Sequence, residues 1–81
     1  MSKTITGADG KEYLIEPEAN LTNADLSSAN LRWAELSEAN LSNAELEFAN
    51  LRNANLSEAK LSDANLSGAD FSETVLYNIS I

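Results

Sequence analysis

The sequence predicts an all-β protein in which a short repeat bends the chain at regular intervals and coils it into a solenoid. Three observations support this fold class. Alanine recurs every five residues from Ala19 to Ala69, a large apolar residue stands two positions after each alanine, and strand-like alternation precedes the repeat. Internal repeats of fixed period are typical of solenoid architectures.

The repeat reads A-[N/D/E/K]-L-x-x, with almost no interruption from Ala19 onward. Thr74 and Leu76 form a degenerate last unit. We expect the large apolar side chains to fill the interior and the alanines to sit beside the corners, where only a small side chain fits. The predicted core residues are Leu21, Leu26, Leu31, Leu36, Leu41, Leu46, Leu51, Leu56, Leu61, Leu66, Phe71 and Leu76.

A period of five residues fits neither a straight helix nor a straight strand. At about 100° per residue, successive leucines on a helix would be displaced by roughly 140° and form no apolar face. In a strand, an odd spacing sends successive leucines to opposite faces. The pattern is satisfied when the chain bends once per repeat, because alanine and leucine, two positions apart, then point inward together.

The spacing alone does not prove how the coil closes. The motif resembles the pentapeptide-repeat family, over residues 19–76. The resemblance implies a right-handed quadrilateral parallel β-helix, in which four sides close a coil of 20 residues, and a right-handed path is also the usual hand of parallel connections. About three coils would form a rod roughly 15 Å long. Departures from the motif are Glu35, Glu45 and Lys60 in the polar position, Phe71 at a centre, and the unit Thr74-Val75-Leu76.

Both ends carry sequence suited to capping, which open β-solenoids need because exposed edges invite pairing. Residues 1–18 predict an N-terminal β-hairpin cap, since two strand-like runs flank the turn residues Asp9 and Gly10. Ile15 falls one residue out of the repeat register, and Pro17 then redirects the chain. Residues 19–76 form the predicted β-helix, and the apolar residues 77–81 form a tail that either folds over the last coil or meets a second copy.

The composition argues against catalysis. The chain has neither histidine nor cysteine, which removes the commonest general base, the commonest metal ligand and the sulfur nucleophile. No polar constellation interrupts the repeat, so we expect no catalytic residues, no cofactor and no metal site. The carboxylates of Asp25, Glu45 and Glu47 could gather, but the glycine-rich pattern of calcium β-rolls is missing.

The charge balance predicts the kind of partner. Thirteen Asp and Glu against five Lys and Arg give a formal charge of −8, which disfavours nucleic acid and anionic membranes and favours a basic protein partner. No apolar run is long enough to span a bilayer, and no apolar leader follows Met1. We therefore expect a soluble, cytoplasmic protein.

Residues 20 apart should lie above one another, so the surface can be predicted as ladders. Asn20 over Asn40 and Asn23 over Asn43 indicate structural amide ladders. Like charges also stack, with Arg32 over Arg52 and Glu38 over Glu58, either as a binding strip or as a solvated face.

Exposed aromatic residues are the best candidates for an interface, because such side chains are enriched at protein contacts. Trp33 and Phe48 stand at corner positions where most repeats carry Asn, Ser or Glu. A lone surface aromatic is also compatible with an unused surface. The full candidate interface is Trp33, Phe48, Phe71, Tyr77, Ile79 and Ile81, of which the last four belong to the C-terminal end.

These observations predict a non-catalytic scaffold or protein-interaction module, with a homodimer through the C-terminal end as one arrangement. The resemblance implies an alternative, since some members of the family are acidic DNA mimics that act on DNA gyrase and confer quinolone resistance. A turn of B-DNA is about 34 Å, longer than the predicted rod, so this alternative requires an end-to-end dimer.

Overall fold

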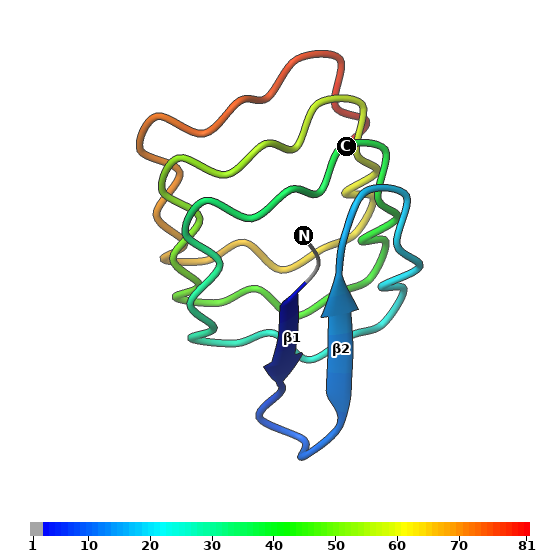
Figure 1. The fold of residues 1–81 in the computed structure, drawn as a ribbon, viewed down its shortest axis with the longest axis vertical. Coiled ribbons are helices and arrows are strands. Elements are labelled where there is room, and N and C mark those ends of the chain that lie inside the picture. Colours follow the sequence, from blue (N-terminus) through cyan, green and yellow to red (C-terminus); the bar gives the residue numbers. More distant parts are fainter. Residues whose placement is uncertain (1–2) are drawn as a thin grey trace.

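The computed structural model describes residues 3–81, which form stacked coils with a β-hairpin at one end (Figure 1). The hairpin consists of β1 (Lys3–Thr6) and β2 (Glu12–Ile15), paired antiparallel with Lys3 opposite Ile15 and Thr6 opposite Glu12. No helix within residues 3–81 has the length and hydrophobicity needed to cross a bilayer. The described structure contains strands, bridges and turns only.

The coils are held together by parallel bridges between residues 20 apart. Nine such bridges lie within residues 3–81, from Asn20 with Asn40 to Lys60 with Ser80. Each connects the polar position of one repeat with the same position one coil later. The first coil therefore spans residues 19–38, the second 39–58 and the third 59–78.

Each repeat ends in a tight turn that makes one corner. The Ala24 N–H donates to the Leu21 carbonyl at 3.0 Å, and the same bond recurs at each repeat up to Thr74. The residue before the alanine position has a positive φ, for example 64° at Asn23, which is the signature of a type II turn. Four turns per 20 residues give four faces. Face 1 holds residues 19–23, 39–43 and 59–63; face 2 holds 24–28, 44–48 and 64–68; face 3 holds 29–33, 49–53 and 69–73; face 4 holds 34–38, 54–58 and 74–78.

The interior is a column of leucines lined by alanines at the corners. Nine of the twelve predicted core side chains, Leu21 to Leu61, are no more than 3% exposed. Leu66 and Phe71 are only partly buried, and Leu76 is 39% exposed. Leu76 is therefore not a core residue, contrary to the sequence prediction, because no further coil lies over the third one on this face.

Ile15 completes the core at the other end. It is 2% exposed and belongs to the same apolar cluster as the leucines. The main chain already follows the repeat at Glu16, whose carbonyl accepts the Ala19 N–H just as the leucine carbonyls do in later repeats. In this first repeat Glu16 stands at the leucine position. The apolar side chain comes instead from Ile15, which precedes it and is the last residue of β2.

The C-terminal residues continue the coil instead of folding back over it. Ser80 donates its N–H to the Ala59 carbonyl at 2.9 Å, and its carbonyl accepts the Leu61 N–H at 2.7 Å. Residues 79–81 therefore begin another turn on face 1, and of the two predicted arrangements of the tail, folding over the last coil is not observed. The orange and red part of the last coil lies at the top of Figure 1, whereas the loop of the hairpin lies at the bottom.

Candidate interaction surfaces

The end of the third coil is an open edge. In the second coil, the N–H groups of Leu46, Leu51 and Leu56 donate to carbonyls of the third coil at 2.8–2.9 Å. The corresponding N–H groups of the third coil belong to Leu66, Phe71 and Leu76, and no group within residues 3–81 accepts them. Unpaired strand edges of this kind are available for pairing with another chain.

Apolar side chains accompany this open edge. Val75, Tyr77 and Ile81 are 48%, 66% and 87% exposed, next to Leu76. Of the predicted interface residues at this end, Tyr77 and Ile81 are thus exposed, whereas Phe71 and Ile79 are partly buried against the core. The exposed side chains can therefore make contacts without any change of the core, while Phe71 and Ile79 contribute mainly to it.

The other two predicted interface residues flank a single face. Phe48 is 71% exposed in the turn that precedes face 3, and Trp33 is 66% exposed in the turn that ends face 3. The sequence predicts both as exposed corner aromatics, and both are exposed. Phe48 lies one coil above Ser28, at the corner where face 3 begins, and Trp33 lies at the corner where face 3 ends.

The Phe48 ring packs against the main chain of Gly68. A Cβ atom added to Gly68 would lie 2.6 Å from two carbons of that ring, so no side chain fits there without displacing it. The φ of Gly68 is +70°, a conformation that glycine adopts without strain. The ring therefore packs against the main chain of the next coil while remaining 71% exposed.

The polar position of the repeat satisfies the main chain locally. Asn40 Oδ1 accepts the Ser42 N–H at 3.0 Å, and Asn55 Oδ1 accepts the Ser57 N–H at 3.0 Å. The predicted role of these amides is structural, and their hydrogen bonds run within a repeat instead of between stacked amides. In the same way, an Oδ1 atom accepts the main-chain N–H two residues later at Asn20, Asp25, Asn30, Asn50, Asn65 and Asp70.

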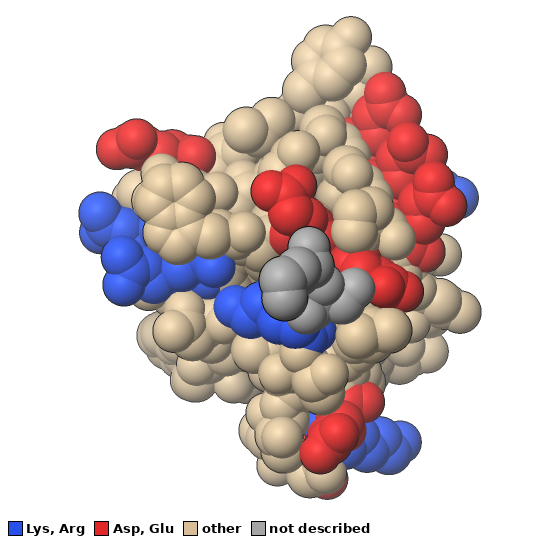
Figure 2. All heavy atoms as spheres, in the orientation of Figure 1, with Lys and Arg blue, Asp and Glu red and all other residues tan. Residues whose placement is uncertain are grey.

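Arginine and glutamate occupy different corners. Arg32 and Arg52 stack in the turn that ends face 3, whereas Glu18, Glu38 and Glu58 stack at the corner between face 4 and face 1. Figure 2 shows a group of basic side chains at the left, with an acidic group directly above it, and a longer run of acidic side chains at the right. The molecule thus presents surfaces of opposite charge although its net charge is strongly negative.

Three carboxylates approach one another on face 2. Asp25 and Glu45 are paired by a main-chain bridge, and the Ser27 hydroxyl donates to Glu47 Oε1 at 3.1 Å. A hydrogen bond with Glu47, followed by the negative charge of that residue, raises the pKa of Glu45. No group of three or more acidic side chains within residues 3–81 has the arrangement of a metal site.

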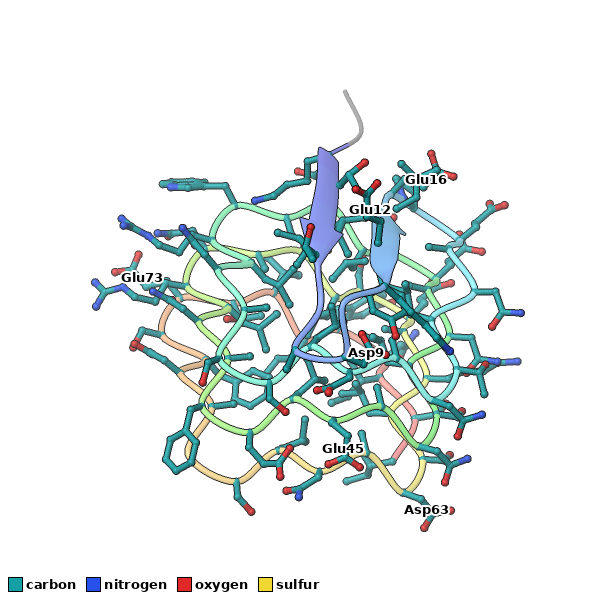
Figure 3. The ribbon with its side chains drawn as sticks, turned by 90° about the horizontal axis from the view of Figure 1, so that it is seen from below. Asp9, Glu12, Glu16, Glu45, Asp63 and Glu73 are labelled. Atoms are coloured by element: carbon teal, nitrogen blue, oxygen red, sulfur yellow. The ribbon has the colours of Figure 1, made fainter. Side chains whose placement is uncertain are left out.

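A short hydrogen-bonded chain attaches the hairpin to the first coil. The Tyr13 hydroxyl donates to Asp9 Oδ2 at 2.6 Å and accepts the Asp25 N–H at 3.3 Å. The bond from Tyr13, with a second from the Lys11 N–H, holds the pKa of Asp9 below its usual value, and the same bond raises the pKa of Tyr13. In Figure 3 the hairpin lies over the end of the coils, and Asp9 is at its loop.

Comparison with family models matches this repeat architecture to pentapeptide repeats, in eight copies over residues 17–43 and 39–78. The chain belongs to the pentapeptide-repeat family. The match confirms the resemblance seen in the sequence, and its start at residue 17 agrees with the main chain entering the repeat at Glu16. No curated protein matches this pentapeptide-repeat chain.

Proposed function

We propose that this pentapeptide-repeat protein is a non-catalytic, cytoplasmic interaction scaffold, a right-handed quadrilateral β-helix that associates with a second copy through its third coil. The observation that carries the proposal is the open edge of that coil. Its unpaired N–H groups at Leu66, Phe71 and Leu76 lie beside the exposed apolar side chains of Val75 and Tyr77. Main-chain pairing combined with apolar contact is the usual basis of strand addition.

A scaffold of this kind acts through its surface chemistry. The absence of histidine and cysteine from the sequence supports a non-catalytic role. The stacked glutamates Glu18, Glu38 and Glu58 favour a basic protein as a further partner, because their carboxylates are spaced one coil apart along one corner. Complementary charges of this type chiefly increase the association rate and the specificity.

Light scattering coupled to size exclusion, over a range of protein concentrations, tests the proposed association. We expect a dimer whose dissociation is promoted by Tyr77→Ser combined with Val75→Ser. Both side chains are exposed, so the double variant should keep its fold. The matched control is Leu14→Ser, which removes a 49% exposed apolar side chain from β2, in the hairpin. A monomer of 8.7 kDa at every concentration would overturn the proposal.

The second candidate function is that of an acidic DNA mimic, which the stacked glutamates Glu18, Glu38 and Glu58 favour. The molecule measures 30 × 28 × 20 Å along its principal axes, shorter than the roughly 34 Å of one B-DNA turn. Action on DNA gyrase would therefore need the dimer. A gyrase supercoiling assay tests it: we expect inhibition by the dimeric protein and none by the Tyr77→Ser, Val75→Ser variant, and equal effects of both would contradict a mimic that depends on length.

A further inference from the structure

Face 3 combines most of the basic groups of the chain with both aromatic residues of the repeat corners. The chain has five Lys and Arg residues in all, and three of them lie on or beside this face. Lys3 reaches it from β1, since its Nζ lies 3.5 Å from the Asn30 carbonyl oxygen. We call this surface the arginine–aromatic face; it consists of Lys3, Asn30, Arg32, Trp33, Phe48, Asn50 and Arg52.

The hydrogen-bonding groups that this face presents outward are almost all donors. Asn30 Oδ1 accepts the Arg32 N–H at 3.2 Å, and Asn50 Oδ1 accepts the Arg52 N–H at 3.1 Å. The acceptor end of each amide is thus used by the main chain, which leaves the amide N–H groups available. Together with the guanidinium groups, they form a donor-rich strip that needs acceptors from outside.

The positive charge of the strip is only partly compensated. Arg52 pairs with Asp70 at 3.8 Å, and both side chains remain 49% and 43% exposed. No carboxylate within residues 3–81 pairs with Arg32. Asp70 and Glu73 are the acidic residues of face 3 and belong to the third coil, where Glu73 points outward in Figure 3, and Glu47 on face 2 directly precedes Phe48. The first two coils of this face are therefore cationic on a protein of charge −8.

The two aromatic rings stand in a conformation that does not favour them. Trp33 has a φ of 62° and Phe48 a φ of 59°, whereas the equivalent corner positions elsewhere carry Asn, Ser, Asp, Glu or Gly. A positive φ is disfavoured for bulky residues. Both rings are largely exposed, so burial does not offset this cost, and the Phe48 ring packs against Gly68. Tryptophan and arginine are enriched in binding hot spots, and phenylalanine is enriched at protein interfaces.

We propose that the arginine–aromatic face binds an acidic segment of a partner protein, with carboxylates on Arg32 and Arg52 and apolar side chains on Trp33 and Phe48. This inference rests on the proposed role as an interaction scaffold, but it uses none of the residues of the third-coil edge. A protein segment fits better than nucleic acid, because it offers apolar side chains to the exposed rings of Trp33 and Phe48 as well as carboxylates to the two arginines.

Trp33 is the single tryptophan of the chain, so its fluorescence reports directly on this face. The probe is a short synthetic peptide that alternates glutamate and leucine; a peptide that alternates lysine and leucine and an oligothymidylate serve as comparisons. We expect a saturable shift of the Trp33 emission with the glutamate peptide alone. Arg32→Ala with Arg52→Ala should weaken binding about a hundredfold, because each substitution removes a charge-assisted hydrogen bond that contributes about tenfold.

Two matched variants separate a binding role from a general effect of charge or fold. Lys60→Ala removes an exposed cation from face 1 and should leave the affinity unchanged. Arg32→Lys keeps the charge but loses the planar fork and should weaken binding less than alanine does. Circular dichroism of each variant checks that the coil is intact.

Several results would overturn the inference. These are an unchanged Trp33 emission, equal binding of the lysine peptide, tighter binding of the oligothymidylate, or an equal loss in Lys60→Ala. Light scattering on the Arg32→Ala, Arg52→Ala protein keeps the two proposals apart. Dimerisation through the third coil should be unaffected in this variant, whereas Tyr77→Ser with Val75→Ser should bind the glutamate peptide normally.

Discussion

The first and the third coil are both terminal, yet their interiors differ. Leu21 in the first coil is 3% exposed, and the three leucines that follow it are fully buried. In the third coil, Leu66 and Phe71 are only partly buried, and Leu76 is 39% exposed. The large apolar residue recurs at the same position of the repeat at both ends, with Phe71 replacing leucine in the third coil. The difference comes from the hairpin, which places Ile15 in the core and packs Ile5 and Tyr13 against it.

This contrast shows that the burial of a core side chain in a solenoid depends on the adjacent coils. Each repeat supplies one large apolar side chain, but the coils before and after it decide how much water that side chain loses. Stability is then approximately a sum of contributions from each repeat and from each contact between adjacent coils. The same leucine should therefore matter very differently in the middle and at the open end.

The largest effect is expected for truncation of a central leucine. Leu46 is fully buried in the second coil, so Leu46→Ala should lower the free energy of unfolding by about 3–5 kcal/mol. Leu76→Ala removes a partly exposed side chain and should cost about 1 kcal/mol or less. Urea unfolding followed by circular dichroism measures both, and equal losses would contradict the dependence on neighbours.

Removing the contribution of the hairpin should make the first coil resemble the third. Ile15→Ala should lower the free energy of unfolding by about 2–4 kcal/mol, because Ile15 is 2% exposed. Hydrogen exchange of the Leu21 and Leu26 amides should accelerate more than that of second-coil amides. Leu14→Ala is the control on the exposed side of β2, and comparable losses in both variants would show that the hairpin acts in another way.

A smaller effect is expected from the polar position. Asn40→Ala deprives the Ser42 N–H of its acceptor and should cost about 1 kcal/mol. At Glu35 the repeat departs from its motif, and the Ser37 N–H has no acceptor within residues 3–81. Glu35→Asn should supply one and stabilise the protein by about 0.5–1 kcal/mol. Thermal unfolding measures both, and a destabilised Glu35→Asn would contradict this role of asparagine.

The smallest effect is a pH dependence of the hairpin attachment. The pKa of Asp9 is lowered in the folded chain, so its contribution is present above the usual value of 3.8 and is lost as the pH falls through the lowered pKa. The pKa of Tyr13 is raised, so its contribution is present below 10.0 and is lost as the pH rises through the raised pKa. The methyl resonances of Ile5 and Ile15 should shift in both ranges.

Two variants assign these transitions. Asp9→Asn should remove the acid transition of the methyl resonances, because the side chain no longer titrates. Tyr13→Phe should remove the alkaline one and also bring the acid transition closer to the usual value for Asp, since the bond that lowers the pKa of Asp9 is lost. An acid transition that persists unchanged in Asp9→Asn would assign it to another carboxyl group.

Much of the fold could be predicted from the sequence because the period of five leaves few solutions. The burial of Leu21 through Leu61 and the antiparallel hairpin are of this kind. The exposure of Leu76 could not be predicted, since its position in the motif equals that of the buried Leu56. Whether a coil lies above a side chain is decided by the path of the chain ends, and the apolar pattern of residues 77–81 is compatible with two paths.

The candidate surface residues were predicted one at a time, but their grouping was not. The sequence indicates that Trp33 and Phe48 are exposed corner residues, and they are. Their joint position on face 3, and the approach of Lys3 to that face, depend on the four turns per coil and on where the hairpin docks. The contact between Gly68 and the Phe48 ring also depends on the stacking of positions 20 residues apart.

The core and the surface of this protein follow two different periods. Inward-facing positions recur every five residues, whereas positions on one face recur every 20. A duplicated or deleted single repeat would leave the interior intact but rotate all subsequent repeats by one face. Arg52 would then move off the face of Arg32. Gain or loss of repeats is thus a route by which such a gene could rearrange its charged and aromatic surfaces while the leucine column stays the same.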